Sequence, residues 1–199
     1  MRNKYWGESN PDKKAGSPGK AEKYITVQDS KIYYYSGVTR ESAAELNKKI
    51  GEIESKSLNL SNTLDIEAPP IRLLINSGGG SITAGISCMD TILRSKVPVH
   101  TYVDGFAASA ATFISVVGDK RFMSRNSYML IHQLSSSFWG TYANFEDEKK
   151  NLDLMMKTIK KVYKEHTNVP MKDLNDILKR DLMWDAEQCL DYGLIDEVV

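Results

Sequence analysis

With 199 residues, the chain is long enough to form one domain with a complete hydrophobic core. Its 26 lysines and arginines equal its 26 aspartates and glutamates, so we expect neither nucleic acid nor an anionic membrane as a partner. No apolar run approaches a transmembrane span, and the N-terminus lacks the apolar core of a signal peptide. We therefore expect a cytoplasmic protein whose two cysteines, Cys88 and Cys189, are buried thiols rather than a disulfide.

The first 23 residues are expected to form a flexible arm, because they are rich in Lys, Gly, Pro, Ser and Asn and show no hydrophobic period. Two short runs with β-branched and aromatic residues follow, at 24–27 and 31–35, and predict strands. Thr39 is placed to cap a helix that continues to about Lys56.

From residue 71 onward, short apolar strands alternate with helices. The expected elements are, in chain order, a strand at 71–76, a helix at 82–95, a strand at 97–103, a helix at 107–117 and a strand at 128–132. This alternation, with its short connections, predicts an α/β fold with largely parallel pairing. In such folds ligands gather at the carboxyl ends of the strands, where the glycine turn at 77–81, Ser109 and His132 all lie.

A long charged helix is expected at about 144–166, with an apolar stripe that comprises Phe145, Leu152, Met156, Ile159 and Tyr163. The stripe fits packing on the helix's own domain or burial against a second subunit. After Pro170 we expect a helix at 171–179, a second helix capped by Asp185 and ended by Gly193, and a last strand at 194–199.

Ser109 is the candidate nucleophile. It lies in a run of small residues at 103–112, where an apolar strand leads into a helix. A hydroxyl at that position meets the positive end of the helix dipole, and the first helical N–H groups are free to receive a developing anion. A helix of small residues that contains a serine by chance is the competing interpretation of this run.

The glycine turn at 77–81 has two interpretations. It lacks the Gly-Lys-Ser/Thr ending of a phosphate-binding loop, and Thr83 stands where a dinucleotide fingerprint would need its last glycine. A turn of this kind before a helix can instead direct N–H groups toward an oxyanion. A simple tight turn is the alternative.

His132 is the best candidate base, because it ends a buried strand on the same rim as Ser109. His100 lies inside a strand, and His166 ends the charged helix, where we expect it in solvent. A buried histidine satisfied by the backbone remains the alternative for His132. An orienting carboxylate would come from one of the aspartates after the long helix, which are Asp176, Asp181 and Asp185. Spacing alone does not choose between them.

The order serine, histidine, aspartate differs from that of the α/β-hydrolases, chymotrypsin and subtilisin. It resembles the proteolytic subunit family of the Clp protease (ClpP), whose signatures are similar to four segments of this chain. The segments are Asn-Ser-Gly-Gly-Gly-Ser-Ile-Thr-Ala-Gly (76–85), Gly-Phe-Ala-Ala-Ser-Ala-Ala (105–111), Met-Leu-Ile-His-Gln (129–133) and Lys-Arg-Asp-Leu-Met-Trp-Asp-Ala-Glu (179–187). The similarity runs from about residue 71 to the end and more loosely back to about residue 24.

The resemblance implies a serine endopeptidase that acts through an acyl-enzyme and needs no metal or cofactor. It implies Ser109 as nucleophile, His132 as general base and Asp181 as orienting acid. It also implies an oxyanion hole made by the N–H groups of Gly80 and Ala110, with Gly79 shaping the turn that supports it.

The resemblance further implies one domain over 24–199, built as a ClpP/crotonase-like spiral of β-β-α units with a protruding handle helix at about 144–166. Such chains form seven-membered rings that stack as a tetradecamer around a closed chamber, receive peptides or unfolded proteins, and can dock on a Clp-type AAA+ unfoldase. Arg180 corresponds to a residue that couples ring contacts to the active site.

The chain departs from the family pattern after His132, where the family commonly has proline and glycines along a substrate-pairing strand. Leu134, Phe138 and Trp139 stand in this stretch and are candidates for lining the substrate groove. A catalytically silent ring subunit and a phage-type maturation peptidase of the same fold are alternatives. A crotonase-like acyl-CoA enzyme is a third alternative, although such an enzyme would not need serine, histidine and aspartate together.

Overall fold

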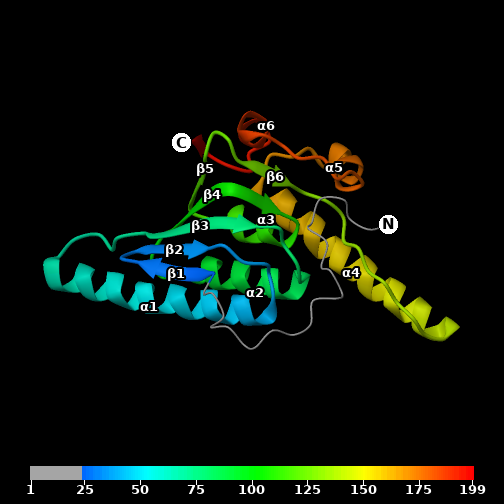
Figure 1. The fold of residues 1–199 in the computed structure, drawn as a ribbon, viewed down its shortest axis with the longest axis horizontal. Helices are drawn as coiled ribbons and strands as arrows, with labels where there is room; N and C mark the ends of the chain where they lie inside the picture. Colours follow the sequence, from blue (N-terminus) through cyan, green and yellow to red (C-terminus); the bar gives the residue numbers. More distant parts are fainter. Residues whose placement is uncertain (1–23) are drawn as a thin grey trace, which may run out of the picture.

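The computed structural model describes residues 24–199; the predicted arm at 1–23 lies outside the described residues. Figure 1 shows a twisted sheet with helices packed on it and one helix that projects away from the body. The strands are β1 (Ile25–Gln28), β2 (Lys31–Tyr34), β3 (Ile71–Ser77), β4 (Val99–Ala108), β5 (Lys120–Met123), β6 (Tyr128–Leu130) and β7 (Glu197–Val198). The helices are α1 (Arg40–Leu64), α2 (Ile82–Leu93), α3 (Ala110–Ser115), α4 (Tyr142–His166), α5 (Met171–Leu178) and α6 (Ala186–Asp191). Within residues 24–199, no helix combines the length and the apolar character needed to cross a membrane.

The strand order is β1-β2-β3-β4-β5-β7, with β6 paired to β4. Among these seven strands of the described chain, only the β1–β2 pair is antiparallel, so the predicted α/β fold with mainly parallel pairing is confirmed. Ile71, Leu73 and Ile75 of β3 are buried, whereas Arg72 between them is exposed. The strand at 71–77 is therefore buried on one face only, because helices α1, α2 and α3 pack on a single side of the sheet.

Strand β4 changes its neighbour along its length, and this change positions the site. Its first half, from His100 to Val103, pairs with β5, and its last residues, from Phe106 to Ala108, pair with β6. Gly105 lies between the two halves with φ 91°, and a Cβ there would come within 2.7 Å of the Asn76 side chain. The switch brings the end of β6 beside the end of β4.

Several predicted boundaries were wrong for identifiable reasons. Helix α1 begins after Thr39, which forms a capping box with Ser42, but it continues to Leu64 rather than to about Lys56. Its contact with the core ends near Leu58, and the turns beyond it continue because helix propagation adds one hydrogen bond per residue until the left-handed Asp65 stops it. The apolar pattern marked the buried face and not the helix end.

Strand β5 was not predicted, because the sequence at 120–123 shows no apolar alternation; its pairing with β4 and β7 makes it a strand. Of the last predicted strand at 194–199, only Glu197–Val198 pairs as a strand. Helix α2 ends at Leu93 rather than at 95, and Leu93 itself is 51% exposed. The predicted helix at 107–117 is shorter, since residues 107 and 108 belong to β4.

His166 is half-buried rather than fully in solvent, and burial lowers the pKa of its imidazole. Its backbone oxygen accepts a hydrogen bond from the Arg121 guanidinium at 2.5 Å. The same guanidinium donates to Gly193 O at 2.8 Å and forms an ion pair with Asp196. Arg121 therefore connects β5, the end of α4 and the C-terminal segment, and it holds the pKa of the Asp196 carboxyl below its usual value.

The base of α4 is attached to the core by Tyr163, which is 1% exposed. The Thr112 hydroxyl donates to Ser109 O at 2.6 Å and lies 2.7 Å from the Tyr163 hydroxyl. Because the single Thr112 proton is used on Ser109, Tyr163 is the donor to Thr112. This chain of hydrogen bonds connects α4 with the turn at Ser109.

We expect Tyr163→Phe to lower the free energy of unfolding by about 1 kcal/mol, because it removes a buried hydrogen bond. Urea denaturation at fixed protein concentration measures the change. Tyr128→Phe is the matched control, since the Tyr128 ring is 47% exposed, and we expect no change beyond about 0.5 kcal/mol. Equal stability of Tyr163→Phe and wild type would contradict this role for the hydroxyl.

The cysteines are free and buried, as the sequence predicted. Burial raises the pKa of both thiols to about 12, so almost no reactive thiolate is present near neutral pH. We expect neither Cys88 nor Cys189 to react with a thiol reagent at pH 8 in the folded protein, and both to react in denaturant. Rapid alkylation of the native protein, read by intact mass, would contradict this burial.

Candidate active site

Ser109 occupies a strained turn between β4 and α3, with φ 54° and ψ −127°. Positive φ is unfavourable for a residue with a Cβ and persists only where the surroundings fix it. The Ser109 N–H donates to Leu130 O at 2.8 Å, and Ser109 O accepts from Thr112 N at 2.9 Å. Its hydroxyl makes no capping bond to the helix. A serine on a sharp strand-to-helix turn, with its hydroxyl free, has the geometry of a nucleophile turn.

The glycine turn packs directly on the Ser109 turn. A Cβ on Gly79, which has φ 86°, would lie 2.4 Å from Ala108 O and 2.7 Å from Ser109 Cβ. A Cβ on Gly80 would lie 2.4 Å from Val38 O. Both positions need glycine, because their backbones approach other backbone atoms too closely for a side chain.

Two backbone N–H groups lie next to the serine without a protein acceptor among the described residues. On either side of Gly80, Val38 N donates to Gly79 O and Ser81 N to Val38 O, both at 2.8 Å, which leaves the Gly80 N–H unused. Ala110 is the first residue of α3, so its N–H has no partner within the helix. Gly80 is exposed and lines the cavity at Ser109, whereas Ala110 is fully buried and does not line it.

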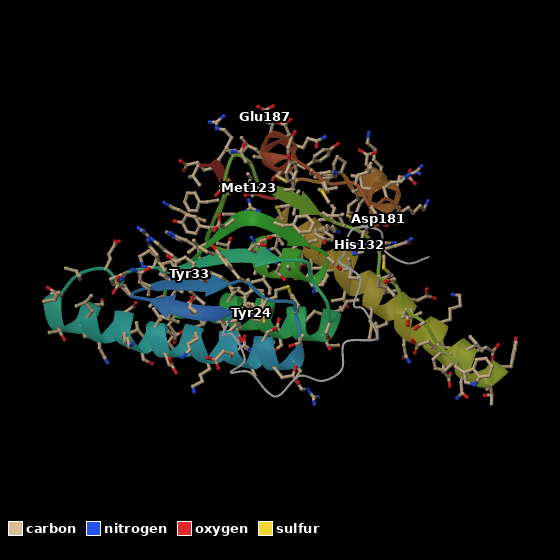
Figure 2. All side chains as sticks on the ribbon, in the orientation of Figure 1. Tyr24, Tyr33, Met123, His132, Asp181 and Glu187 are labelled. Carbon is tan, nitrogen blue, oxygen red and sulfur yellow. The ribbon has the colours of Figure 1, made fainter. Side chains whose placement is uncertain are left out.

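His132 and Asp181 form a hydrogen-bonded pair, with 2.9 Å between His132 Nδ1 and Asp181 Oδ1. Figure 2 shows the two side chains next to each other, although they are far apart in the sequence. Since a carboxylate only accepts, Nδ1 carries the proton, and Nε2 is the nitrogen free to accept one. The pair can therefore act as a base with a fixed tautomer.

Backbone contacts explain why Asp181 is the aspartate that reaches His132. Met129 and Trp184 exchange two hydrogen bonds of 2.9 and 2.7 Å, and Gln133 N donates to Leu178 O at 2.6 Å. These bonds hold the segment 178–184 alongside β6 and the residues that follow it. The other two candidates are used elsewhere: Asp176 contacts Lys179 at 3.0 Å, and Asp185 caps α6 through Gln188 N at 2.9 Å.

Ser109, His132 and Asp181 line one cavity of about 200 Å³. No hydrogen bond joins the Ser109 hydroxyl to His132 within the described part of the chain. Leu134 lines the same cavity, as do six residues that were not predicted as site residues, namely Gly78, Ile82, Ala108, Leu130, Ser135 and Met183. All six lie within or next to the motifs shared with the family, but only the fold shows that they face the cavity.

The remaining predicted site residues lie away from this cavity. Phe138 packs edge-on against Phe145 of α4, with ring centroids 5.2 Å apart, and Trp139 is 95% exposed. The structure does not bring either ring to the cavity that contains Ser109. Arg180 is exposed and lines a different cavity of about 240 Å³ with Trp184 and Tyr192. Among residues 24–199, no group of three or more His, Cys, Asp or Glu side chains is arranged to hold a metal ion.

The fold and this cavity define an α/β protein that carries the residue set of a serine hydrolase at the carboxyl edge of a parallel sheet. The Clp protease family model matches residues 23–199, and the chain belongs to this family. The structure is similar to that of a mutant of ClpP1 from Listeria monocytogenes, with a TM-score of 0.71 and 27% identity over 83% of this chain and 88% of that one. The predicted ClpP-like fold is thereby confirmed.

Curated relatives have similar sequences over part of the chain. ATP-dependent Clp protease proteolytic subunit 1 of Streptomyces avermitilis is 39% identical over 131 residues, which are 65% of this chain and 60% of that protein. The ATP-dependent Clp protease proteolytic subunit of Deinococcus radiodurans is 35% identical over 140 residues, 68% of this chain and 69% of that protein. The match thus spans 60% of the length of the first of these relatives.

We expect Gly79→Ala to destabilise the protein by about 1–3 kcal/mol and to displace the Ser109 turn, because an L side chain at φ 86° is strained and contacts Ala108 O. Gly51→Ala is the matched control. Gly51 lies in α1, and no atom lies within 4 Å of the position that an added methyl group would take, so alanine should stabilise by about 0.5–1 kcal/mol. Thermal unfolding measures both changes. A Gly79→Ala protein that is as stable as the wild type would contradict the packing argument.

Proposed function

We propose that the chain is a serine endopeptidase of the ClpP type, which hydrolyses peptide bonds of peptides or unfolded proteins. The observation that carries this proposal is the hydrogen bond between His132 and Asp181 in the cavity that also contains Ser109. A free hydroxyl, an imidazole with a fixed tautomer and a carboxylate are the groups that acyl transfer needs.

In the proposed reaction, Ser109 Oγ attacks the scissile carbonyl carbon while His132 Nε2 takes the hydroxyl proton. The negative charge that develops on the carbonyl oxygen is received by the N–H groups of Gly80 and Ala110, with Gly79 holding the turn in place. Asp181 stabilises the imidazolium. His132 then gives the proton to the leaving amine, and a water molecule, activated by the same imidazole, hydrolyses the acyl-enzyme.

We propose that the enzyme works as two stacked seven-membered rings around a chamber in the cytoplasm. The N-terminal part of α4 supports this assembly, because it packs little on its own domain: Phe145 is 51% and Leu154 64% exposed. Exposed apolar side chains along one helix fit a partner surface. Arg180 would couple such contacts to the site, and a Clp-type AAA+ unfoldase would supply unfolded chains.

A fluorophosphonate probe tests the peptidase proposal. We expect the wild type to be labelled and Ser109→Ala to be unlabelled, with turnover of a fluorogenic peptide reduced by about 10⁶. Ser55→Ala, on the exposed side of α1, is the control and should be labelled like the wild type. Native mass spectrometry of the same samples gives the ring size.

One result would contradict the proposed peptidase activity, and another would contradict the proposed ring assembly. An unlabelled wild-type ring would favour a catalytically silent subunit. A labelled species no larger than a trimer would support the chemistry but exclude the chamber.

A further inference from the structure

The cavity at Ser109 continues into a second cavity of about 470 Å³ that extends toward α4. Gly80, Ile82, Leu134 and Ser135 line both cavities, so the two are parts of one groove. The outer wall of the second cavity is formed by residues of α4, namely Glu148, Asn151, Leu152, Leu154 and Met155. We call this second cavity the α4 groove. When the scissile carbonyl of a peptide lies at Ser109, the peptide residues next to the scissile bond can enter this groove.

The α4 groove is mainly apolar, and Glu148 is the one charged side chain among the described residues that line it. Glu148 is half-buried, whereas the other residues from 141 to 150 are exposed. Its carboxylate receives a hydrogen bond from the Ser136 hydroxyl at 3.5 Å, a distance at the outer limit for such a bond, and forms no ion pair with any described residue. The groove thus presents a carboxylate without a cation.

Nearby lysines do not neutralise this carboxylate. Lys149 binds Asp153 at 2.6 Å and Lys150 binds Asp147 at 3.3 Å, and both lysine side chains are more than three-quarters exposed. No described lysine or arginine lines either part of the groove, and the opposite end carries Asp181. The charged residues that line the groove are therefore carboxylates, although the whole chain has a formal net charge of zero.

We propose that Glu148 makes the enzyme prefer peptides with lysine or arginine near the scissile bond, an inference that rests on the proposed peptidase function. The aliphatic stem of such a residue would lie along Leu134 and Leu152, and its charged head would pair with Glu148. A glutamate side chain in the same place would meet the Glu148 carboxylate and be disfavoured by the like charge.

Matched peptides that carry lysine, norleucine or glutamate at single positions around the scissile bond test this proposal. For the wild type, kcat/KM falls from lysine to norleucine to glutamate at one or more positions. Glu148→Gln lowers the lysine-to-norleucine ratio about fivefold, the size expected for a half-exposed ion pair. Glu148→Lys inverts the order of lysine and glutamate, and added salt reduces the wild-type preference.

Glu146→Gln is the matched control, because it makes the same charge change on the same helix at an exposed residue outside the groove. It retains the wild-type ratio. The proposal is overturned if Glu148→Gln leaves the ratio unchanged while its ring mass is that of the wild type. An equal fall in Glu146→Gln overturns it as well.

Binding to Ser109→Ala separates this inference from the proposed function. Fluorescence anisotropy with labelled lysine and norleucine peptides shows tighter binding of the lysine peptide, and Glu148→Gln in the same background removes the difference. This result without hydrolysis by the wild type would retain the groove preference and refute the peptidase. Hydrolysis without any charge preference would refute the groove preference alone.

Discussion

The positive φ of Ser109 is the constraint on which the rest of the site depends. This backbone conformation is unfavourable by about 1–3 kcal/mol for a non-glycine residue, so it persists only because several segments fix it together. The Leu130 carbonyl accepts from the serine N–H, Thr112 donates to its carbonyl, and Gly79 packs against its Cβ. Tyr163 extends the hydrogen bonds to α4. The strain is thus supported by β6, α3, α4 and the glycine turn.

The neighbour change along β4 gives this turn its surroundings. Because β4 pairs first with β5 and then with β6, the end of β6 lies beside Ser109, and His132 follows two residues later. The C-terminal segment then runs along the same strand end and brings Asp181 to the imidazole. Three parts of the chain that are remote in sequence converge because Ser109 and His132 follow the neighbouring strands β4 and β6, and the segment that contains Asp181 is hydrogen-bonded to Met129 and Gln133. The pairing of β4 with β6 therefore sets the positions of the three side chains, and their functional groups set what they can do chemically.

The groove between this site and α4 links the proposed catalysis to the helix that projects from the body. Leu134 and Ser135 belong to both cavities, and Glu148 adds the only charge that the described residues bring to the outer one. The same helix presents exposed apolar residues at Phe145 and Leu154. Helix α4 thus lines the groove and, in the proposed assembly, also contacts another subunit, and Leu154 belongs to both surfaces.

The sequence alone determined the local chemistry: the glycines at 79 and 80, the small residues around Ser109, the caps at Thr39 and Asp185, and the parallel α/β alternation. These features depend on residues close together in the chain, so their pattern is visible without a structure. Strand β5, the length of α1 and the position of Phe138 depend on pairing and packing partners that local patterns do not contain. The choice among Asp176, Asp181 and Asp185 followed from a family resemblance, and spacing left it open. Only the tertiary structure placed Asp181 within 2.9 Å of His132, because separation along a chain does not fix distance in space.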